Sequence, residues 1–338
     1  MASFEKRPNG WRAQISIKGV RDSKVLATKA QAQAWAAQRE TEIRTQLETG
    51  IVRGKTLDEA FRRYEKEVSV HKRSHAWEVK RLIWTGEYKI DGVRLGDMPL
   101  VQVTSDLLGR FRDQRLAGTK EWPPISGSTF NRDLNLLSNV LRIAAQEWKW
   151  INESPTRNVR RPKNSLPRDR LFTQDEIDRL CINLGFDFGP VVTKRQATAA
   201  AMMFAIETAM RESEICSLTK KDISGRVAHL RMTKNGRKRD VPLSSAALKI
   251  LACLPEPESD DAPLFTLTAV RLSTHFRNAT SQCLIEDLHF HDTRHEAITR
   301  LAKKLSILDL ARMVGHTDLR MLQIYYNEKA ADIAARLD

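Results

Sequence analysis

The sequence predicts a mainly α-helical protein with small β elements, arranged in three domains. Residues 1–54 alternate between apolar and polar side chains and then take on a helical composition. Residues 55–160 contain several amphipathic helical stretches, and residues 161–338 mix helical stretches with a hairpin signal. A chain of 338 residues is long enough for two domains and a small third. We therefore expect a small sheet-plus-helix domain, a helical domain and a mixed α/β domain.

The first domain should consist of strands followed by one helix. Apolar side chains alternate with polar ones after Gly10: Trp11, Ala13, Ile15 and Ile17 against Arg12, Gln14, Ser16 and Lys18. Such alternation is typical of a strand buried on one face. Residues 24–28 form a second candidate strand. Residues 29–50 have helical composition and end at Gly50, a common helix C-cap.

The second domain should be helical and should lead into an extended linker. Thr56 and Glu59 have the spacing of a capping box at a helix start. Residues 104–118 and 126–151 have further amphipathic helical patterns. Residues 152–170 contain prolines, five Arg and one Lys, but no apolar periodicity. This composition predicts a linker without regular structure.

The third domain should combine helices with one hairpin. Helices are predicted over residues 173–184, 196–209 and 211–219, and again from about residue 244 to the end. Residues 227–244 carry an Asn-Gly pair between two short strand-like runs, which is a strong hairpin signal. Neither a Rossmann glycine fingerprint nor a P-loop is present.

The net charge points to a polyanionic partner. The chain has 56 Lys and Arg against 42 Asp and Glu, a net charge of +14, and nucleic acid is the leading candidate partner for so basic a protein. We expect DNA contacts from the polar strand face, the linker and the hairpin: Arg12, Gln14, Lys18, Arg157, Arg160, Arg161, Lys163 and Arg237. The alternative is a solvated basic surface, and for the first domain a folding or dimerisation module.

Several classes of protein are disfavoured. The four cysteines, Cys181, Cys216, Cys253 and Cys283, form no CxxC pair, so we expect no zinc site, as suits a reducing cytoplasm. The N-terminus lacks the apolar core of a signal peptide, and no apolar run approaches the roughly 20 residues that span a bilayer. The sequence also lacks a carboxylate cluster with two-metal spacing, which argues against a metal-dependent nuclease. We therefore expect a cytoplasmic protein that does not act at a membrane.

Four short stretches of the third domain carry side chains that could bind or attack a phosphate. They hold Arg211 with Glu214, Lys234, His291 with Arg294, and Gly315–His316 followed nine residues later by Tyr325. Residues three apart share a helical face, so a carboxylate can orient the first Arg. A His and an Arg presented together can hold a phosphate and move a proton. Each stretch alone also fits a surface ion pair, a solvated turn or a structural histidine.

Taken in this order, the stretches resemble the signature of the tyrosine recombinases, also called the phage integrase family. HDTRH is similar to that family's HDLRH, and VGHTDLRMLQIYYN is similar to LGHsSixTTxxYtH, with the same spacing from His to Tyr. TKNGRKRDVPL resembles the family's Lys hairpin, and AMRESEI resembles TGLRisEl. The resemblance covers roughly residues 170–330. Residues 1–50 resemble the three-stranded arm-binding domains of phage integrases.

The resemblance implies a DNA strand-exchange enzyme with C-clamp architecture. Its domains would be an arm-binding domain (1–54), a helical core-binding domain (55–160) and a catalytic domain (161–338). The resemblance implies that Tyr325, rather than Tyr326, is the nucleophile and that Lys234 is the general acid. Arg211, Arg294 and His316 would bind the phosphate, the last by a hydrogen bond. His291 would assist proton transfer at the tyrosine, and Glu214 would support the site. The intermediate would be a 3′-phosphotyrosyl link, formed without metal, cofactor or nucleotide.

The resemblance also implies the partners. We expect a homo-tetramer on double-stranded DNA with specific core and arm sites, together with a DNA-bending accessory or directionality protein. The last helical stretch places Ala330, Ile333, Ala334 and Leu337 on one stripe, which would dock on a neighbouring protomer or pack on its own domain.

Three alternatives stay open at this point. The catalytic half is also similar to shufflon-type DNA invertases. A catalytically silent DNA-binding regulator would keep the scaffold without the chemistry, and a topoisomerase would use the same tyrosine without strand exchange. The arm-like first domain favours an integrase that integrates and excises a mobile element.

Overall fold

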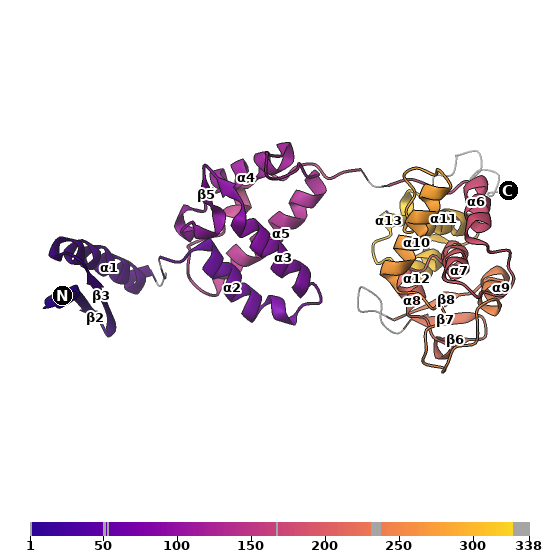
Figure 1. The fold of residues 1–338 in the computed structure, drawn as a ribbon, viewed down its shortest axis with the longest axis horizontal. Helices are drawn as coiled ribbons and strands as arrows, with labels where there is room; N and C mark the ends of the chain where they lie inside the picture. Colours follow the sequence, from indigo (N-terminus) through magenta and orange to yellow (C-terminus); the bar gives the residue numbers. More distant parts are fainter. Residues whose placement is uncertain (1, 50–51, 53, 167, 231–237, 327–338) are drawn as a thin grey trace. The chain divides into compact units, whose positions relative to one another are not determined.

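The protein forms two compact units, Met1–Leu166 and Pro167–Asp338 (Figure 1). The structure is a computed structural model that describes residues 2–49, 52, 54–166, 168–230 and 238–326. Within that described part, no helix has the length and apolar character needed to cross a membrane. The predicted domain boundaries near residues 54 and 160 stay predictions.

The N-terminal part is a three-stranded antiparallel sheet with one helix against it. The strands β1 (Ser3–Arg7), β2 (Gly10–Ile17) and β3 (Val20–Leu26) pair in the order β1-β2-β3. Helix α1 (Lys29–Thr49) packs on β2. Its small core is made by Ala13, Ile15, Ala32, Ala36 and Ile43, so the alternation predicted for β2 is confirmed.

Two details of this sheet differ from the sequence prediction. Strand β1 was not predicted, and β3 begins at Val20 instead of Lys24. Both edge strands are mostly exposed, so they carry little apolar periodicity. Lys18 is not on the strand face: with Gly19 it makes the two-residue turn between β2 and β3, and both have positive φ (43° and 87°).

The rest of the first unit is a helical bundle. Its helices are α2 (Leu57–Glu67), α3 (His75–Glu87), α4 (Ser105–Ala117) and α5 (Gly127–Gln146). A small hairpin is formed by β4 (Lys89–Ile90) and β5 (Val93–Arg94). Short 3-10 turns lie at Ser69–His71, Leu95–Asp97, Leu100–Gln102 and Pro155–Asn158. The predicted capping box at Thr56 and Glu59 is present. Helix α5 ends at Gln146, five residues before the predicted end, because Trp148 and Trp150 turn back to pack under the guanidinium of Arg63.

Part of the predicted linker is held against α5. Asn131 donates to the carbonyl of Pro162 at 2.9 Å, and the backbone N–H of Ser165 donates to Ser128 at 2.8 Å. A Cβ on Gly127 would lie 2.1 Å from the carbonyl oxygen of Lys163, so only glycine permits this close approach. Residues 162–165 have no regular secondary structure, as predicted, but these contacts hold their backbone against α5.

The second unit surrounds the buried helix α7 (Lys194–Thr208), which packs against α6 (Gln174–Leu184), α8 (Glu212–Cys216), α9 (Ser245–Ala252), α10 (Ala269–Gln282) and α11 (Asp292–Ala302). The remaining elements are a 3-10 turn (Lys220–Asp222), β6 (Ile223–Ser224), β7 (Val227–Leu230), β8 (Arg239–Pro242), α12 (Ile307–Val314) and α13 (Arg320–Gln323). Strands β7 and β8 pair antiparallel, as the hairpin signal predicts.

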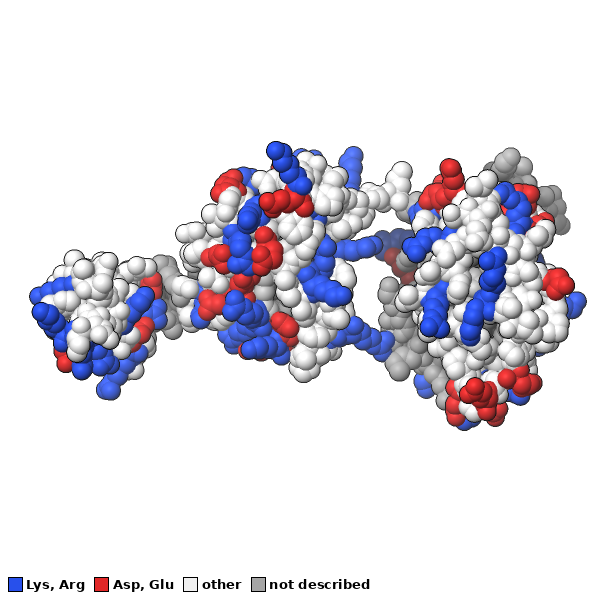
Figure 2. Space-filling model, viewed as in Figure 1, with Lys and Arg blue, Asp and Glu red and all other residues white. Residues whose placement is uncertain are grey.

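The predicted helices of this unit are confirmed in position, with corrected lengths. The helix expected over 211–219 covers only Glu212–Cys216. The helical region after residue 244 is divided into separate helices, because Ser244, Thr268 and Ser306 each cap a new helix start. In the space-filling view, acidic side chains gather at the β6 end of this unit, and Lys and Arg spread over other parts of the visible face (Figure 2).

A separate apolar cluster positions the end of the described chain. Ile298, Leu310, Val314 and Leu322 are buried together, and Tyr325 and Tyr326 pack against them. This cluster joins α11, α12 and α13, so it brings the stretches around Arg294, His316 and Tyr325 to one place.

Candidate active site

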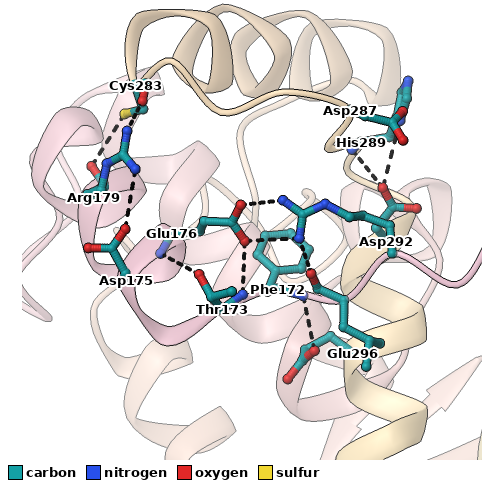
Figure 3. A network of polar contacts seen from close by, with 12 residues as sticks. Phe172, Thr173, Asp175, Glu176, Arg179, Cys283, Asp287, His289, Asp292 and Glu296 are labelled. Carbon is teal, nitrogen blue, oxygen red and sulfur yellow. Dashed lines mark hydrogen bonds and ion pairs between the residues drawn. The ribbon is translucent and has the colours of Figure 1, made fainter.

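The first turn of α11 presents His291 and Arg294. His291 occupies the N-cap position, and Asp292 accepts a hydrogen bond from the backbone N–H of His289 at 2.8 Å. Arg168, which comes from the predicted linker, donates to both oxygens of Asp292 at 3.1 and 2.8 Å. One turn later, Glu296 accepts from the backbone N–H of Phe172 at 3.2 Å. Figure 3 shows Asp292 beside Asp287 and His289, with Glu296 reaching the backbone at Phe172.

Arg294 is buried and its guanidinium is held by backbone carbonyls. It donates to the carbonyl of Ala209 and, at 2.6 Å, to that of Val314. Ala209 caps α7 in the left-handed conformation (φ 52°), which turns its carbonyl towards α11. No carboxylate pairs with Arg294 among the described residues. Burial and then the nearby cations lower the pKa of Arg294 to about 9, so it remains cationic at neutral pH.

Arg211 and Glu214 form a hydrogen-bonded pair within the site. Glu214 accepts from the backbone N–H of Arg211 at 2.8 Å and from its guanidinium at 3.0 Å. Arg211 stands at the start of α8, immediately after the turn that contains Ala209. The geometry therefore lets Glu214 orient the Arg211 side chain.

Arg239 is a buried member of the site that the sequence did not reveal. Its guanidinium donates to both oxygens of Glu214 at 2.8 and 2.7 Å, and its Nε donates to the carbonyl of Met313 at 3.0 Å. Burial alone would raise the pKa of Glu214, but the hydrogen bonds of Arg239 and the charge of Arg211 lower it. The signal that could have revealed Arg239 is strand alternation: Arg239 and Val241 are two positions apart, so they share the buried face of β8. The sequence pattern predicts instead that the basic residues of this hairpin face solvent or DNA.

His316 extends the cluster from the turn after α12. Its Nε2 lies 3.4 Å from Nη2 of Arg294. An arginine has only donors, so Nε2 must accept and the ring proton must sit on Nδ1. That buried Nδ1 has no hydrogen-bond partner within the described ranges. Burial and then the cations of Arg294, Arg211 and Arg239 lower the pKa of His316 to about 4, so the ring is neutral at pH 7.

The two adjacent tyrosines point to different partners. The Tyr325 hydroxyl lies 2.6 Å from Nδ1 of His295, whereas the Tyr326 hydroxyl donates to the carbonyl of Leu305 at 2.8 Å. Tyr325 lies in the turn that follows α13, and Tyr326 comes after it without regular secondary structure, so neither tyrosine is in a helix. Burial raises the pKa of Tyr325, and the Arg294 cation acts in the opposite direction.

His295 is the second residue that sequence reasoning missed. In the sequence His295 does not share the three-residue offset of His291 and Arg294, so the motif pattern gives it no role. Its partner, Tyr325, comes from another segment, and an offset within one helix says nothing about such a contact. His291 lies nearby, with its ring centroid 6.1 Å from that of His295.

The other predicted residues that the structure describes belong to the first unit. Arg12 and Gln14 lie on the sheet face opposite α1, and Arg157, Arg160, Arg161 and Lys163 are exposed. Lys234, Arg237 and the last helical stretch (328–338) lie outside the described residues. Over the described ranges, no group of three or more His, Cys, Asp or Glu side chains is placed to hold a metal ion.

Comparisons with known proteins agree with this architecture. Residues 170–332 match the model of the phage integrase family. The chain is 38% identical to a Haemophilus influenzae protein provisionally named integrase/recombinase, over 96% of this chain and 87% of that protein. It is 36% identical to a shufflon-specific DNA recombinase of Escherichia coli, over 85% of this chain and 73% of that protein.

The fold is also that of solved integrase structures. A lambda integrase dimer bound to a COC′ core site matches 97% of this chain and 95% of its own, with a TM-score of 0.65 and 18% identity. The Tn1549 transposon integrase (residues 82–397) in complex with circular intermediate DNA matches 84% of this chain and 100% of its own, with a TM-score of 0.64 and 19% identity. The chain belongs to the phage integrase family of tyrosine recombinases.

Proposed function

We propose that this tyrosine-type, site-specific DNA recombinase integrates and excises a mobile element, with Tyr325 as its nucleophile. The observation that carries the proposal is the surplus of positive charge beside Tyr325. Arg211 and Arg239 share Glu214, whereas the hydrogen-bond partners of the Arg294 guanidinium among the described residues are carbonyls and His316. A DNA phosphate would supply the missing negative charge.

In the proposed reaction, Arg211 and Arg294 bind the non-bridging oxygens of the scissile phosphate. The Nδ1–H of His316, which has no partner in the part of the chain that the structure describes, is a further donor for such an oxygen. Donors held in place before the reaction contribute on the order of 3 kcal/mol each in other enzymes. Tyr325 attacks phosphorus and forms a 3′-phosphotyrosyl link, and Lys234 protonates the leaving 5′ oxygen. A 5′ hydroxyl then reverses the step and rejoins the DNA.

Integration and excision are favoured over inversion by the N-terminal sheet. One face of this sheet packs on α1, and the other presents Arg12 and Gln14, which suits contacts to arm sites outside the core site. Inversion is the second candidate, because the shufflon-specific relative matches 85% of this chain. Sequencing the junctions formed on cognate DNA distinguishes the two: exchange between two molecules supports integration, and reversal of a segment supports inversion.

The assembly is proposed by analogy. A lambda integrase tetramer bound to a Holliday junction has the same fold, with a TM-score of 0.61. We propose a homo-tetramer on two core sites, helped by a DNA-bending accessory or directionality protein, acting in the cytoplasm.

The nucleophile is tested with a nicked suicide substrate that traps the covalent intermediate. Tyr325→Phe should give no covalent protein–DNA band, because it lacks the attacking oxygen. Tyr326→Phe is the matched control and should still give the band, because the Tyr326 hydroxyl is bonded to the carbonyl of Leu305. The reverse pattern would assign the nucleophile to Tyr326.

A further inference from the structure

We propose that His295 accepts the proton of the Tyr325 hydroxyl during cleavage and returns it during rejoining, in place of His291. This inference rests on the proposed role of Tyr325 as nucleophile. It assigns a catalytic role to a residue to which the sequence motifs give none.

The contact between the two side chains is direct. The Tyr325 oxygen and Nδ1 of His295 are 2.6 Å apart, within the range from which a general base can take a proton. The rings lie side by side, with centroids 6.1 Å apart and planes inclined by 39°. A phenol has an unperturbed pKa near 10, and burial raises that of Tyr325 further. Attack therefore needs a group that removes the proton as the new bond forms.

The surroundings of His295 favour its neutral form, which can accept a proton. Burial has the largest effect and lowers the pKa of His295. The carboxylates of Asp292 and Asp169 raise this pKa by smaller amounts, and the cations of Arg294 and Arg168 lower it. The rings of His291 and His316 also face His295. The neutral ring accepts at Nδ1 when its proton is on Nε2. Its acceptor function is present above its lowered pKa and is lost as the pH falls through that value.

The proton and electron pairs balance in both directions. As the Tyr325 oxygen forms its bond to phosphorus, the phenolic O–H bond breaks and the proton passes to Nδ1 of His295. The bond from phosphorus to the 5′ oxygen breaks, and that oxygen takes a proton from the general acid, Lys234 in the proposed function. In rejoining, the 5′ hydroxyl attacks phosphorus, the tyrosyl ester bond breaks, and the imidazolium of His295 returns the proton to the phenolate.

His291 is placed differently. It stands at the N-cap of α11 on the exposed side of the turn, and its described ring contact is with His295, not with Tyr325. It can therefore serve the phosphate or the general acid, while His295 serves the nucleophile.

The test uses the full-length protein and the nicked suicide substrate. His295→Ala should slow formation of the covalent band by about 100-fold or more, the usual contribution of a general base. His295→Gln keeps a hydrogen-bond acceptor near the tyrosine but cannot take a proton, so it should be equally slow. Added imidazoles should restore His295→Ala at rates that increase with their basicity. His229→Ala, an exposed histidine on β7, is the matched control and should cleave like the wild type.

A second substrate separates the two proton transfers. With a 5′-bridging phosphorothiolate, the leaving thiolate needs no proton, so a defective general acid is bypassed. His295→Ala should remain slow on this substrate, because its defect lies at the nucleophile. DNA binding and thermal unfolding of each variant show whether it is folded.

Four results would overturn the proposal: a His295→Gln variant that cleaves at the wild-type rate, no response to imidazole by a folded His295→Ala variant, rescue by the phosphorothiolate, or faster cleavage once the contact is removed. A covalent band from Tyr325→Phe would instead contradict the proposed nucleophile, whatever His295 does.

Discussion

At the residue scale, the pair formed by Glu214 and Arg239 connects three segments of the candidate site. The Arg239 side chain is only 6% exposed and that of Glu214 only 5%. Arg239 is hydrogen-bonded to Glu214, which in turn accepts from Arg211. Arg239 also donates to the carbonyl of Met313, close to the turn that carries His316. Two buried charges are tolerated because each guanidinium nitrogen of Arg239 and both carboxylate oxygens of Glu214 take part in hydrogen bonds.

We expect Arg239→Ala to lower both stability and cleavage. Removing one partner of a buried ion pair typically costs about 3–5 kcal/mol, and Arg211 would lose the carboxylate geometry that orients it. Urea unfolding and the rate of covalent-band formation measure the two effects. Arg312→Ala, whose side chain is 82% exposed, is the control and should change the unfolding free energy by less than about 0.5 kcal/mol. Equal behaviour of the two variants would exclude the bridging role.

At the element scale, the start of α11 depends on a segment that precedes α6. The side chain of Asp292 is fully buried, and it accepts from Arg168 and from the backbone of His289. The first turn of α11 is therefore tied to residue 168, at the beginning of the second unit. This anchor fixes the backbone on both sides of His291.

Replacing Asp292 by Asn should therefore destabilise the second unit. The variant loses the charge of a buried acceptor, which typically costs about 1–3 kcal/mol. Asp287→Asn is a matched control, because Asp287 meets the same Arg168 but its side chain is 70% exposed; its effect should be within about 0.5 kcal/mol. Urea unfolding of both variants gives the comparison, and a larger loss for Asp287→Asn would contradict the anchor.

The turn between α12 and His316 gives a second prediction at this scale. Gly315 ends α12 with φ 71°, and a Cβ there would lie 3.1 Å from Cδ of Arg239. Gly185 ends α6 with φ 72°, but a Cβ there would meet nothing within 4 Å. Both Ala variants carry the left-handed strain of roughly 1 kcal/mol, but only Gly315→Ala should also reduce cleavage, because it displaces Arg239. A normal cleavage rate for a folded Gly315→Ala variant would show that the site tolerates this displacement.

At the scale of the whole molecule, most of the surplus of 14 positive charges belongs to the first unit: residues 1–166 hold 31 Lys and Arg against 19 Asp and Glu, whereas residues 167–338 hold 25 against 23. The chemistry lies in Pro167–Asp338, whereas the sheet with Arg12 and Gln14 belongs to Met1–Leu166. Recognition of arm sites and cleavage of the core site should therefore be separable.

A chain that begins at Lys55 should still cleave core-site DNA but should lose protection of distal arm sequences. Footprints of the truncated and full-length proteins on a complete attachment site measure this. The full-length double variant Arg12→Ala, Gln14→Ala tests the same face without removing the domain, and it should weaken arm binding while leaving core cleavage intact. Identical footprints for all three proteins would assign the sheet to folding or dimerisation.

The sequence by itself determined the helices that begin with a good cap, such as those after Thr56 and Thr173, and the order and spacing of the recombinase motifs. These are local features, because caps and helical offsets join residues a few positions apart. The alternation did not reveal the edge strand β1 or the start of β3, because exposed strands show little apolar periodicity.

Only the tertiary structure decided which side chains complete the site. The Arg239–Glu214 pair spans 25 positions of the chain and the Tyr325–His295 pair spans 30. No local pattern specifies either pair, because each depends on how α8, β8, α11 and the turn after α13 pack together. Apolar packing around Leu310 and Leu322 brings these segments into contact, and the polar partners follow from that packing.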